Sequence, residues 1–377
     1  MKRVVVNGAN GFIASNFIHE LLSQGYEVIA LVRSENDLLS KQKMVKALKE
    51  VSNAENLRYE NLHVYNYALL ETDFSLTAKS LTDIFDRDVD YFHFAANLKF
   101  SEKKKEEIFS TNVNGVENSI KVFLKYASTS SRFFFISTAY SCGNTTSVFE
   151  ERFYSNEDIS SFRNYYEQSK RYAENIIKGY IDNKSLNAYI IRPSQVVGNS
   201  KTGVTKTDFG IFDFTKRISR LAFRYPGESI RIKADSEATQ NLIPIDTIVH
   251  YLMHTVSNAE LPRIMNFVAK TSMKNSDIIN CISDEIPITI IPNKVLERET
   301  MSSLERLLDI SMSFTGHYCE TNINFETTNI DKLITTRGNE ITYKSLQMMI
   351  GYFIHNSQKN LKPLNAYSYE ESEADNY

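Results

Sequence analysis

Short apolar runs alternate with helical patterns through the first half of the chain. Runs rich in Val, Ile, Phe and Tyr are typical of buried strands and lie at residues 2–7, 27–32, 62–69, 89–96, 132–138 and 188–197. Between them, apolar residues recur at helical spacing in residues 12–24, 38–51, 76–85, 106–127 and 166–182. Strands that alternate with helices in this way form parallel sheets with helices on both faces. The pattern therefore predicts an α/β fold with a doubly wound parallel sheet.

The alternation weakens after Gly198. The next residues are polar and contain glycine, which is typical of a loop. Short strands are predicted at residues 229–233 and 264–268, and helices at residues 301–314 and 343–355. The second half therefore predicts a smaller, mainly helical C-terminal lobe. The last residues, 363–377, are acidic and poor in aliphatic side chains, so we expect a flexible acidic tail.

The composition is that of an ordinary globular protein. Of the 377 residues, 42% are hydrophobic and 24% are charged, and the net charge of −3 gives no reason to expect a nucleic acid partner. Cys142, Cys281 and Cys319 lie far apart without metal-ligand spacing, so we expect no metal site and a reducing cytoplasm. The apolar runs are too short to cross a bilayer, and we expect a cytoplasmic protein without a membrane anchor.

A glycine-containing turn follows the first predicted strand and opens the first helix. Its glycines allow the backbone to turn tightly and to approach a pyrophosphate, which would lie at the positive end of the helix. The spacing is Gly-x-x-Gly-x-x-Ala, with Ala14 at the position of a third glycine. The alternative is an ordinary turn with two glycines. The residues that we expect to contact a dinucleotide are Gly8, Asn10, Gly11, Phe12 and Ile13.

The end of the second strand indicates which cofactor binds. An acidic residue there would bind the ribose 2′-hydroxyl of NAD, but this chain has Arg33 and no acid before Glu35. An arginine can hold a 2′-phosphate through charge-assisted hydrogen bonds. The sequence therefore favours NADPH, with a solvated surface arginine as the alternative.

Tyr166 and Lys170 lie four residues apart in a predicted helix, so their side chains share one face. An ammonium beside a phenol favours the phenolate and is expected to lower the pKa of the tyrosine. Such a phenol can donate a proton to a carbonyl oxygen during reduction. Tyr165 is a rival, but it is five residues from Lys170 and rotated off that face. Together with the glycine turn, this pair predicts an oxidoreductase.

Longer motifs surround these residues. They are FHFAANLKFS at 92–101, FISTAYSCG at 135–143, the Tyr–Lys helix at 164–176, IRPSQVVGNSKTG at 191–203 and NLIPID at 241–246. On these motifs the chain resembles the extended short-chain dehydrogenase/reductase superfamily. Within it, the chain is similar to the fatty acyl-CoA reductases ("male sterility" proteins) and to the thioester reductase domains of carboxylic acid reductases and nonribosomal peptide synthetases. The resemblance covers residues 1 to 355, although Asn7 replaces the usual Thr, Ala14 a Gly, and Asn97 follows the Ala-Ala pair.

The resemblance assigns roles to individual residues. It makes Thr138 the hydroxyl partner of Tyr166 and Lys170, and it makes Asn112 the helix asparagine that steadies the site. It also implies that Asp73 lies beside the adenine of the cofactor. Ala95, Ala96 and Pro193 match residues that line the cofactor. Cys142 offers an alternative cysteine-thioester chemistry, but a free cysteine is usually a small buried side chain.

We expect an NADP-binding Rossmann domain at residues 1–200, to which residues 241–268 return. Residues 201–240 and 269–362 would then form the substrate-binding lobe. The expected activity is NADPH-dependent reduction of an acyl thioester, bound to CoA or to an acyl or peptidyl carrier protein, to an aldehyde. A second hydride at the same site could carry the aldehyde to the alcohol, and the sequence leaves both products open. Because the chain lacks the adenylation and carrier domains of its multidomain relatives, we expect the thioester to arrive in trans.

Other functions remain open at this stage. An extended-type reductase of a free ketone or aldehyde would use the same Thr-Tyr-Lys set. A nucleotide-sugar epimerase usually retains NAD and so prefers an acid where Arg33 stands. A regulatory protein that binds NADP without turnover is a fourth reading, and the intact catalytic set argues against it.

Overall fold

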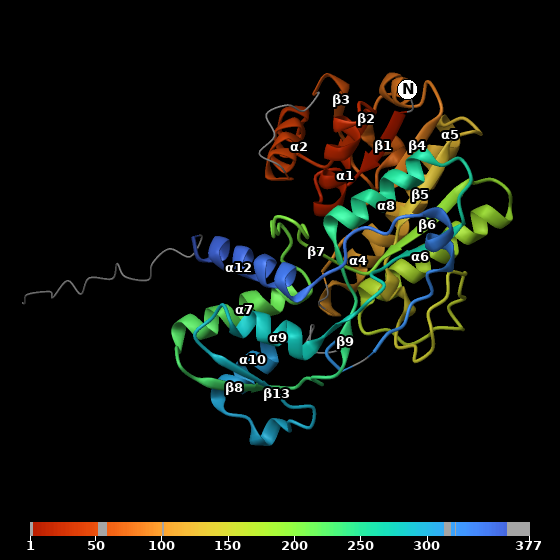
Figure 1. Cartoon of the computed structure of the whole chain (residues 1–377). Coiled ribbons are helices and arrows are strands. Elements are labelled where there is room, and N and C mark those ends of the chain that lie inside the picture. The colour runs from red at the N-terminus through yellow and green to blue at the C-terminus, as the bar shows by residue number, and fades with distance from the viewer. Residues whose placement is uncertain (1–2, 52–58, 100–101, 313–317, 321, 360–377) are drawn as a thin grey trace, which may run out of the picture.

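A central parallel sheet organises the N-terminal half of the molecule (Figure 1). The computed structural model describes residues 3–51, 59–99, 102–312, 318–320 and 322–359. The seven strands run in the order β11-β6-β5-β4-β1-β2-β3, and every neighbouring pair is parallel. They are β1 (Arg3–Asn7), β2 (Glu27–Val32), β3 (Leu62–Asn66), β4 (Val89–His93), β5 (Arg132–Ile136), β6 (Ala188–Pro193) and β11 (Ile264–Phe267). The predicted doubly wound parallel sheet is confirmed.

Helices cover both faces of this sheet. They are α1 (Phe12–Ser23), α2 (Asp37–Val51), α3 (Ala78–Ile84), α4 (Lys105–Phe109), α5 (Gly115–Tyr126), α6 (Tyr165–Asp182), α8 (Ile245–Ser257) and α11 (Thr328–Leu333). Val4 of β1 packs in one apolar cluster with Phe17 and Leu252, whereas the adjacent Val5 packs in another with Ile120 and Ile177. Successive side chains of a strand point to opposite faces, so a strand covered on both sides is apolar throughout.

A second, smaller group of elements forms the lobe below the sheet in Figure 1. Its strands β8 (Ser229–Ile232) and β13 (Thr289–Pro292) are parallel, and β9 (Thr239–Gln240) pairs antiparallel with β12 (Met273–Lys274). Its helices are α7 (Ile211–Arg224), α9 (Asn275–Ser283), α10 (Ser303–Met312) and α12 (Tyr343–Lys359). They share an apolar cluster of their own. The predicted helix at 301–314 extends in part beyond the described residues, and the predicted tail at 363–377 lies outside them.

Two predicted elements are interrupted in the structure. The helix predicted at 106–127 contains a π-helical turn, η4 (Ser110–Asn114), between α4 and α5. The strand predicted at 188–197 divides at Ser194, where β6 ends and β7 (Gln195–Val197) begins. β7 leaves the large sheet and pairs with β10 (Leu242–Pro244). The helical spacing of apolar residues continues across η4, and β6 and β7 follow each other directly, so the pattern did not reveal either break.

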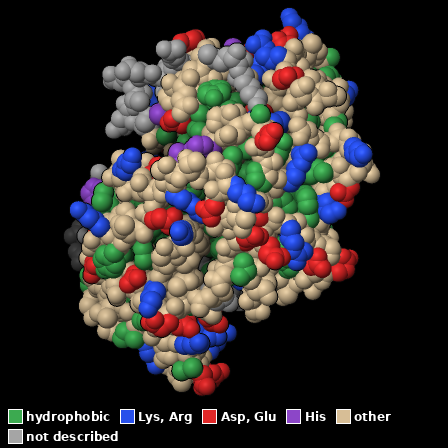
Figure 2. Space-filling view, turned by 45° about the vertical axis from the view of Figure 1, so that its right-hand side comes forward, with side chains coloured by type: hydrophobic (Ala, Val, Ile, Leu, Met, Phe, Trp, Pro, Cys, Tyr) green, Lys and Arg blue, Asp and Glu red, His purple; other side chains and the backbone are tan. Residues whose placement is uncertain are grey.

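Other predicted strands end early. The runs at 62–69, 89–96 and 132–138 leave the sheet at the ends of β3, β4 and β5, and their last residues form loops at its carboxyl edge. Single turns complete the structure: η1 (Tyr59–Asn61), η2 (Thr72–Ser75), η3 (Glu102–Lys104), η5 (Ala139–Cys142) and η6 (Arg298–Thr300). None of the helices in the described ranges has the length and apolarity that a membrane span requires. On the face drawn in Figure 2, acidic and basic side chains are interspersed.

Candidate active site

The glycine turn lies where the strand order reverses, between β1 and β4. Gly8 has a φ of +61°, and a Cβ placed on it would lie 2.8 Å from the backbone nitrogen of Ala95. Gly11 precedes α1, and its N–H donates to the Gly8 carbonyl over 2.9 Å. Asn10 and Gly11 are exposed. The first turn of α1 therefore presents backbone N–H groups at the position where dinucleotide folds bind a pyrophosphate.

Asn7 connects the two strand ends. Its Oδ1 accepts hydrogen bonds from the backbone N–H groups of Phe94 and Ala95 at 2.9 and 3.0 Å. Its Nδ2 donates to the Tyr91 hydroxyl at 3.1 Å and lies 2.8 Å from His93 Nδ1. The sequence marked Asn7 only as a departure from threonine. The structure shows that its two-sided amide positions the backbone of Ala95 against the glycine turn.

Arg33 lies directly after β2. Its side chain is exposed, and within the described ranges no acidic side chain engages its guanidinium. The ammonium of Lys43 donates to the Arg33 carbonyl at 3.3 Å, so a second cation lies beside it. Tyr67 is buried near Gly8 and Arg33, and burial raises the pKa of its phenol. Lys43 and Tyr67 carry no motif, and sequence analysis did not find them.

Asp73 lies away from this turn. Its carboxylate pairs with Lys125 at 2.7 Å and accepts from the Tyr126 hydroxyl at 3.1 Å. Both partners are at the end of α5, whereas Gly115 begins that helix at the carboxyl side of the sheet. Ten residues of helix span about 15 Å. The structure therefore ties Asp73 to the end of α5, and its contact with the adenine stays a prediction.

The candidate catalytic helix is α6. Its N-cap is Asn164, whose Oδ1 accepts from the Glu167 N–H at 2.9 Å. Lys170 is buried and donates from Nζ to the Ile136 carbonyl over 2.7 Å. This ammonium also lies 5.9 Å from the centroid of the Tyr166 ring. Tyr165 faces elsewhere, since Lys105 lies over its ring at 4.9 Å. The predicted register of the Tyr–Lys pair thus agrees with the structure.

The pKa values of this pair differ from the sequence-based expectation. Burial lowers the pKa of Lys170 to about 7, against the opposing effect of the Glu174 charge. Burial also raises the pKa of Tyr166, and the Glu167 charge adds to that rise. The expected lowering of the Tyr166 pKa by Lys170 is not found, because removal of the phenol from water destabilises its charged form. Tyr166 therefore stays protonated at neutral pH.

Thr138 follows β5, two residues after the carbonyl that Lys170 binds. Its side chain is buried, and its Oγ1 accepts from the Tyr140 N–H at 3.2 Å as the cap of η5. Pro193 ends β6, the neighbouring strand. Ala95 and Ala96 follow β4 on the other side. The carboxyl ends of adjacent parallel strands meet at one edge of a sheet, so the fold gathers these predicted residues there.

Asn112 lies in the π-turn η4 and joins two elements of the site. Its Nδ2 donates to the Ser169 hydroxyl at 2.9 Å and to the Asn97 carbonyl at 3.1 Å. Its Oδ1 accepts from the Asn97 N–H at 2.6 Å. The side chain is fully buried. Asn112 thus fixes α6, one residue before Lys170, to the segment that follows Ala96.

A buried ion pair connects α6 to the end of β6. Glu174 of α6 pairs with Arg192 of β6 at 2.6 Å and accepts a 2.5 Å hydrogen bond from the Ser137 hydroxyl. Burial works to raise the pKa of Glu174, but Arg192 and Arg171 outweigh it and lower that pKa. A paired, hydrogen-bonded carboxylate is tolerated inside a protein. Within the described residues, no cluster of His, Cys, Asp or Glu is suited to a metal ion.

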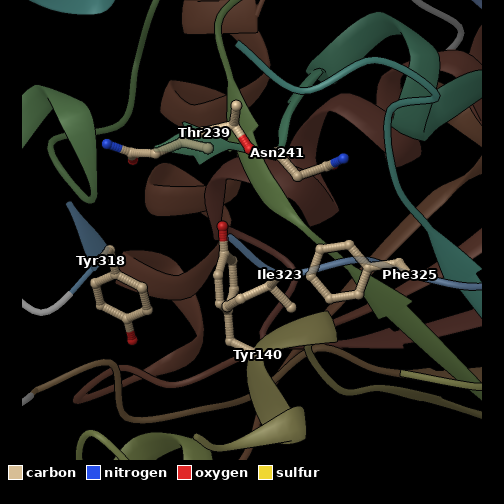
Figure 3. Close-up of a pocket in the computed structure, with 7 residues that line it drawn as sticks. Tyr140, Thr239, Asn241, Tyr318, Ile323 and Phe325 are labelled. Atoms are coloured by element: carbon tan, nitrogen blue, oxygen red, sulfur yellow. The ribbon is translucent and has the colours of Figure 1, made fainter. Parts of the chain in front are cut away.

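A pocket of about 240 Å³ adjoins these elements (Figure 3). Its lining includes Tyr140, Thr239, Asn241, Tyr318, Ile323 and Phe325. Tyr140 belongs to η5, which Thr138 caps. The Tyr318 hydroxyl donates to Glu167 Oε1 at 2.5 Å and accepts from Asn164 Nδ2 at 2.9 Å. Through Tyr318, the wall of the pocket is therefore hydrogen-bonded to the start of α6, where Tyr166 lies. Sequence analysis did not identify its lining, because the residues come from distant segments.

The chain is similar to known proteins of one broad class. The family model described as "Male sterility protein" matches residues 6–252. A dTDP-4-dehydro-6-deoxy-D-allose reductase of Streptomyces sp is 23% identical over 266 residues, covering 70% of this chain and 75% of the Streptomyces protein.

Two solved structures share the fold. The terminal R domain from the myxalamid PKS-NRPS pathway superimposes with a TM-score of 0.78 at 16% identity, covering 94% of this chain and 91% of that one. A thiolation-reductase di-domain from an archaeal non-ribosomal peptide synthetase gives a TM-score of 0.73 at 16% identity, covering 95% of this chain and 76% of that one.

Proposed function

Because the chain belongs to the male sterility protein family, among the NAD(P)-dependent oxidoreductases of the extended short-chain dehydrogenase/reductase type, we propose that it reduces an acyl thioester to an aldehyde with NADPH. The observation that carries the proposal is the geometry of α6. It sets Tyr166 and Lys170 against the strand end that precedes Thr138, beside a pocket. The similarity in fold to two reductase domains of assembly-line enzymes supports a thioester as the substrate.

The residues present fit a phosphorylated dinucleotide. The Gly8 turn would hold the pyrophosphate, and the Arg33 and Lys43 cations would hold a 2′-phosphate. Ala95 and Pro193 would line the nicotinamide side, at the carboxyl ends of their strands. Such a cofactor supplies a hydride.

The chain's own groups would handle the oxygen of the thioester. Thr138 and Tyr166 would donate hydrogen bonds to the carbonyl oxygen, which becomes an oxyanion when hydride reaches the carbon. Tyr166 then gives up its proton, which the raised phenol pKa has kept in place at neutral pH. Lys170 would stabilise the resulting phenolate. The hemithioacetal collapses as its C–S bond breaks, and the products are an aldehyde and a free thiol.

The proposal includes the delivery of the substrate. The thioester would come on CoA or on a carrier protein supplied in trans. The substrate lobe would comprise residues 201–240 and 269–362, which supply Thr239 and Tyr318 to the pocket. Cys142, Cys281 and Cys319 form no disulfide among the described residues. This suits a reducing compartment, and a cytoplasmic location forms part of the proposal.

A reductase of free ketones is the second candidate. It is favoured by the similarity to a Streptomyces sugar reductase, and it would use the same Thr138, Tyr166 and Lys170. The two candidates differ in one product, since only thioester reduction releases a thiol.

Simultaneous measurement of NADPH consumption and thiol release separates these candidates. The purified protein should release one thiol per hydride transferred to an acyl thioester. It should leave the matching free acid unchanged, with or without ATP, because a carboxylate is too weak an electrophile for hydride. Fast reduction of ketones, with no thiol released from any thioester, would establish the second candidate instead.

A further inference from the structure

The pocket beside α6 has one phenol that points into it. In Figure 3 the Tyr140 hydroxyl points toward Thr239 and Asn241, whereas the Tyr318 hydroxyl points away from them. Tyr318 is committed to Glu167 and Asn164. Within the described part of the chain, the Tyr140 hydroxyl has no hydrogen-bond partner. It is therefore the hydroxyl that remains for a ligand.

The neighbouring polar groups are already engaged. The Asn241 amide donates to the Ala269 carbonyl at 2.8 Å and accepts from the Ala269 N–H at 2.9 Å. The Thr239 hydroxyl donates to Asn322 Oδ1 at 3.2 Å. These residues form a fixed polar wall, while Ile323 and Phe325 form an apolar one. A molecule in this pocket meets one available donor and one apolar surface.

The pocket is open to solvent. Its volume of about 240 Å³ includes space outside the protein surface, so a bound group would be only partly enclosed. An acyl group with an oxygen near its carbonyl would satisfy the phenol there. Burial raises the pKa of Tyr140, so this phenol acts as a donor and needs an acceptor.

From this geometry we infer that Tyr140 selects acyl groups that carry an acceptor oxygen a few bonds from the reacting carbonyl. The inference rests on the proposed thioester reduction and names its substrate class. Tyr140 is placed for this role because Thr138 Oγ1 accepts from its N–H, so the selecting hydroxyl and a carbonyl-binding hydroxyl lie two residues apart. A hydroxyacyl group and a peptidyl group share this chemistry, and the test separates them.

The test compares kcat/KM for CoA thioesters of butanoate, 3-hydroxybutanoate and N-acetylglycine. The wild-type protein should prefer 3-hydroxybutanoyl or N-acetylglycyl over butanoyl by about tenfold, as a hydrogen bond to a neutral acceptor allows. Tyr140→Phe should bring the preference close to one while leaving the butanoyl rate nearly unchanged. A preference for 3-hydroxybutanoyl would indicate a hydroxyacyl substrate, and a preference for N-acetylglycyl would indicate a peptidyl substrate.

Tyr59→Phe is the matched control, because it removes one phenol oxygen from an exposed turn that precedes the edge strand β3. It should leave every ratio unchanged. Thiol release without any preference for the oxygenated groups, or a preference that survives Tyr140→Phe, would overturn the inference alone. Absence of thiol release from all thioesters would overturn the proposed function. The same comparison with 2-butanone and 4-hydroxy-2-butanone would then decide the role of Tyr140.

Discussion

The Lys170 ammonium donates a 2.7 Å hydrogen bond to the carbonyl oxygen of Ile136. Ile136 is the last residue of β5, and Lys170 lies one turn after Tyr166 on α6. The contact therefore fixes the distance between the strand that leads to Thr138 and the helix that carries the phenol. The positions of the candidate catalytic groups follow from how one strand and one helix pack together.

Tyr166→Phe should lower turnover by about 100-fold or more, because the proton donor is lost while the ring and its packing remain. The affinity for NADPH should change little. Steady-state kinetics and a fluorescence titration with NADPH measure the two effects. Tyr165→Phe is the control, since its ring lies under Lys105. Full activity in the Tyr166 variant and loss in the Tyr165 variant would show that the other phenol is the donor.

Arg33→Ala should erase most of the preference for NADPH over NADH. We expect the wild-type protein to bind NADPH about tenfold more tightly, which corresponds to about 1.4 kcal/mol. The removed guanidinium is exposed and would hold the 2′-phosphate. Dissociation constants for both cofactors test this, with Arg298→Ala in η6 as a control. Equal affinity for the two cofactors in the unmutated protein would rule out the assignment.

Asn112 and Ser169 should be energetically coupled. Each single change to alanine removes the 2.9 Å hydrogen bond between them, so the double variant should lose less stability than the sum of the singles. A coupling of about 1 kcal/mol is expected from urea unfolding. Asn112→Ala should reduce kcat more than it weakens NADPH binding, because the amide acts through α6. Additive effects would mean that the two side chains act independently.

Gly8→Ala should cost more stability than Gly227→Ala. Both glycines have positive φ, so each substitution carries a backbone cost of about 1 to 2 kcal/mol. Only at Gly8 would the new Cβ meet backbone, 2.8 Å from the Ala95 nitrogen, whereas nothing lies within 4 Å at Gly227. Thermal unfolding measures the difference, and NADPH affinity should fall for Gly8→Ala alone. Equal costs at the two sites would show that the turn can move away from Ala95.

His93 should make the protein sensitive to acid. Burial, together with the smaller effect of the Lys170 charge, lowers the pKa of His93 from the ordinary 6.5 to about 3. Between these values the unfolded chain binds a proton that the folded chain does not. The stability contribution is therefore present above pH 6.5 and is lost as pH falls toward 3, by up to about 1.4 kcal/mol per pH unit. His93→Gln should flatten this slope, and urea unfolding at several pH values measures it. An unchanged slope would place the titration elsewhere.

The sequence predicted the sheet and α6 because strands buried on both faces and amphipathic helices have distinct periodicities. It also placed Tyr166 and Lys170 on one face, since that relation is local. The position of Asp73 could not be read in this way, because the chain between β3 and α3 runs along α5 before it turns. The pKa of Tyr166 depends on burial by remote segments. Tyr140 and Tyr318 meet only after the chain has folded.

The Tyr318–Glu167 hydrogen bond joins residues 151 positions apart. The glycine turn, by contrast, needs only β1, α1 and β4, all within the first hundred residues. Contacts between distant parts of a chain close late, because the intervening loop must lose its entropy first. During synthesis on a ribosome, the glycine turn should thus be able to form while the wall of the substrate pocket has not emerged. A refolding chain should regain the binding of NADPH, measured by the fluorescence of NADPH, before it regains turnover.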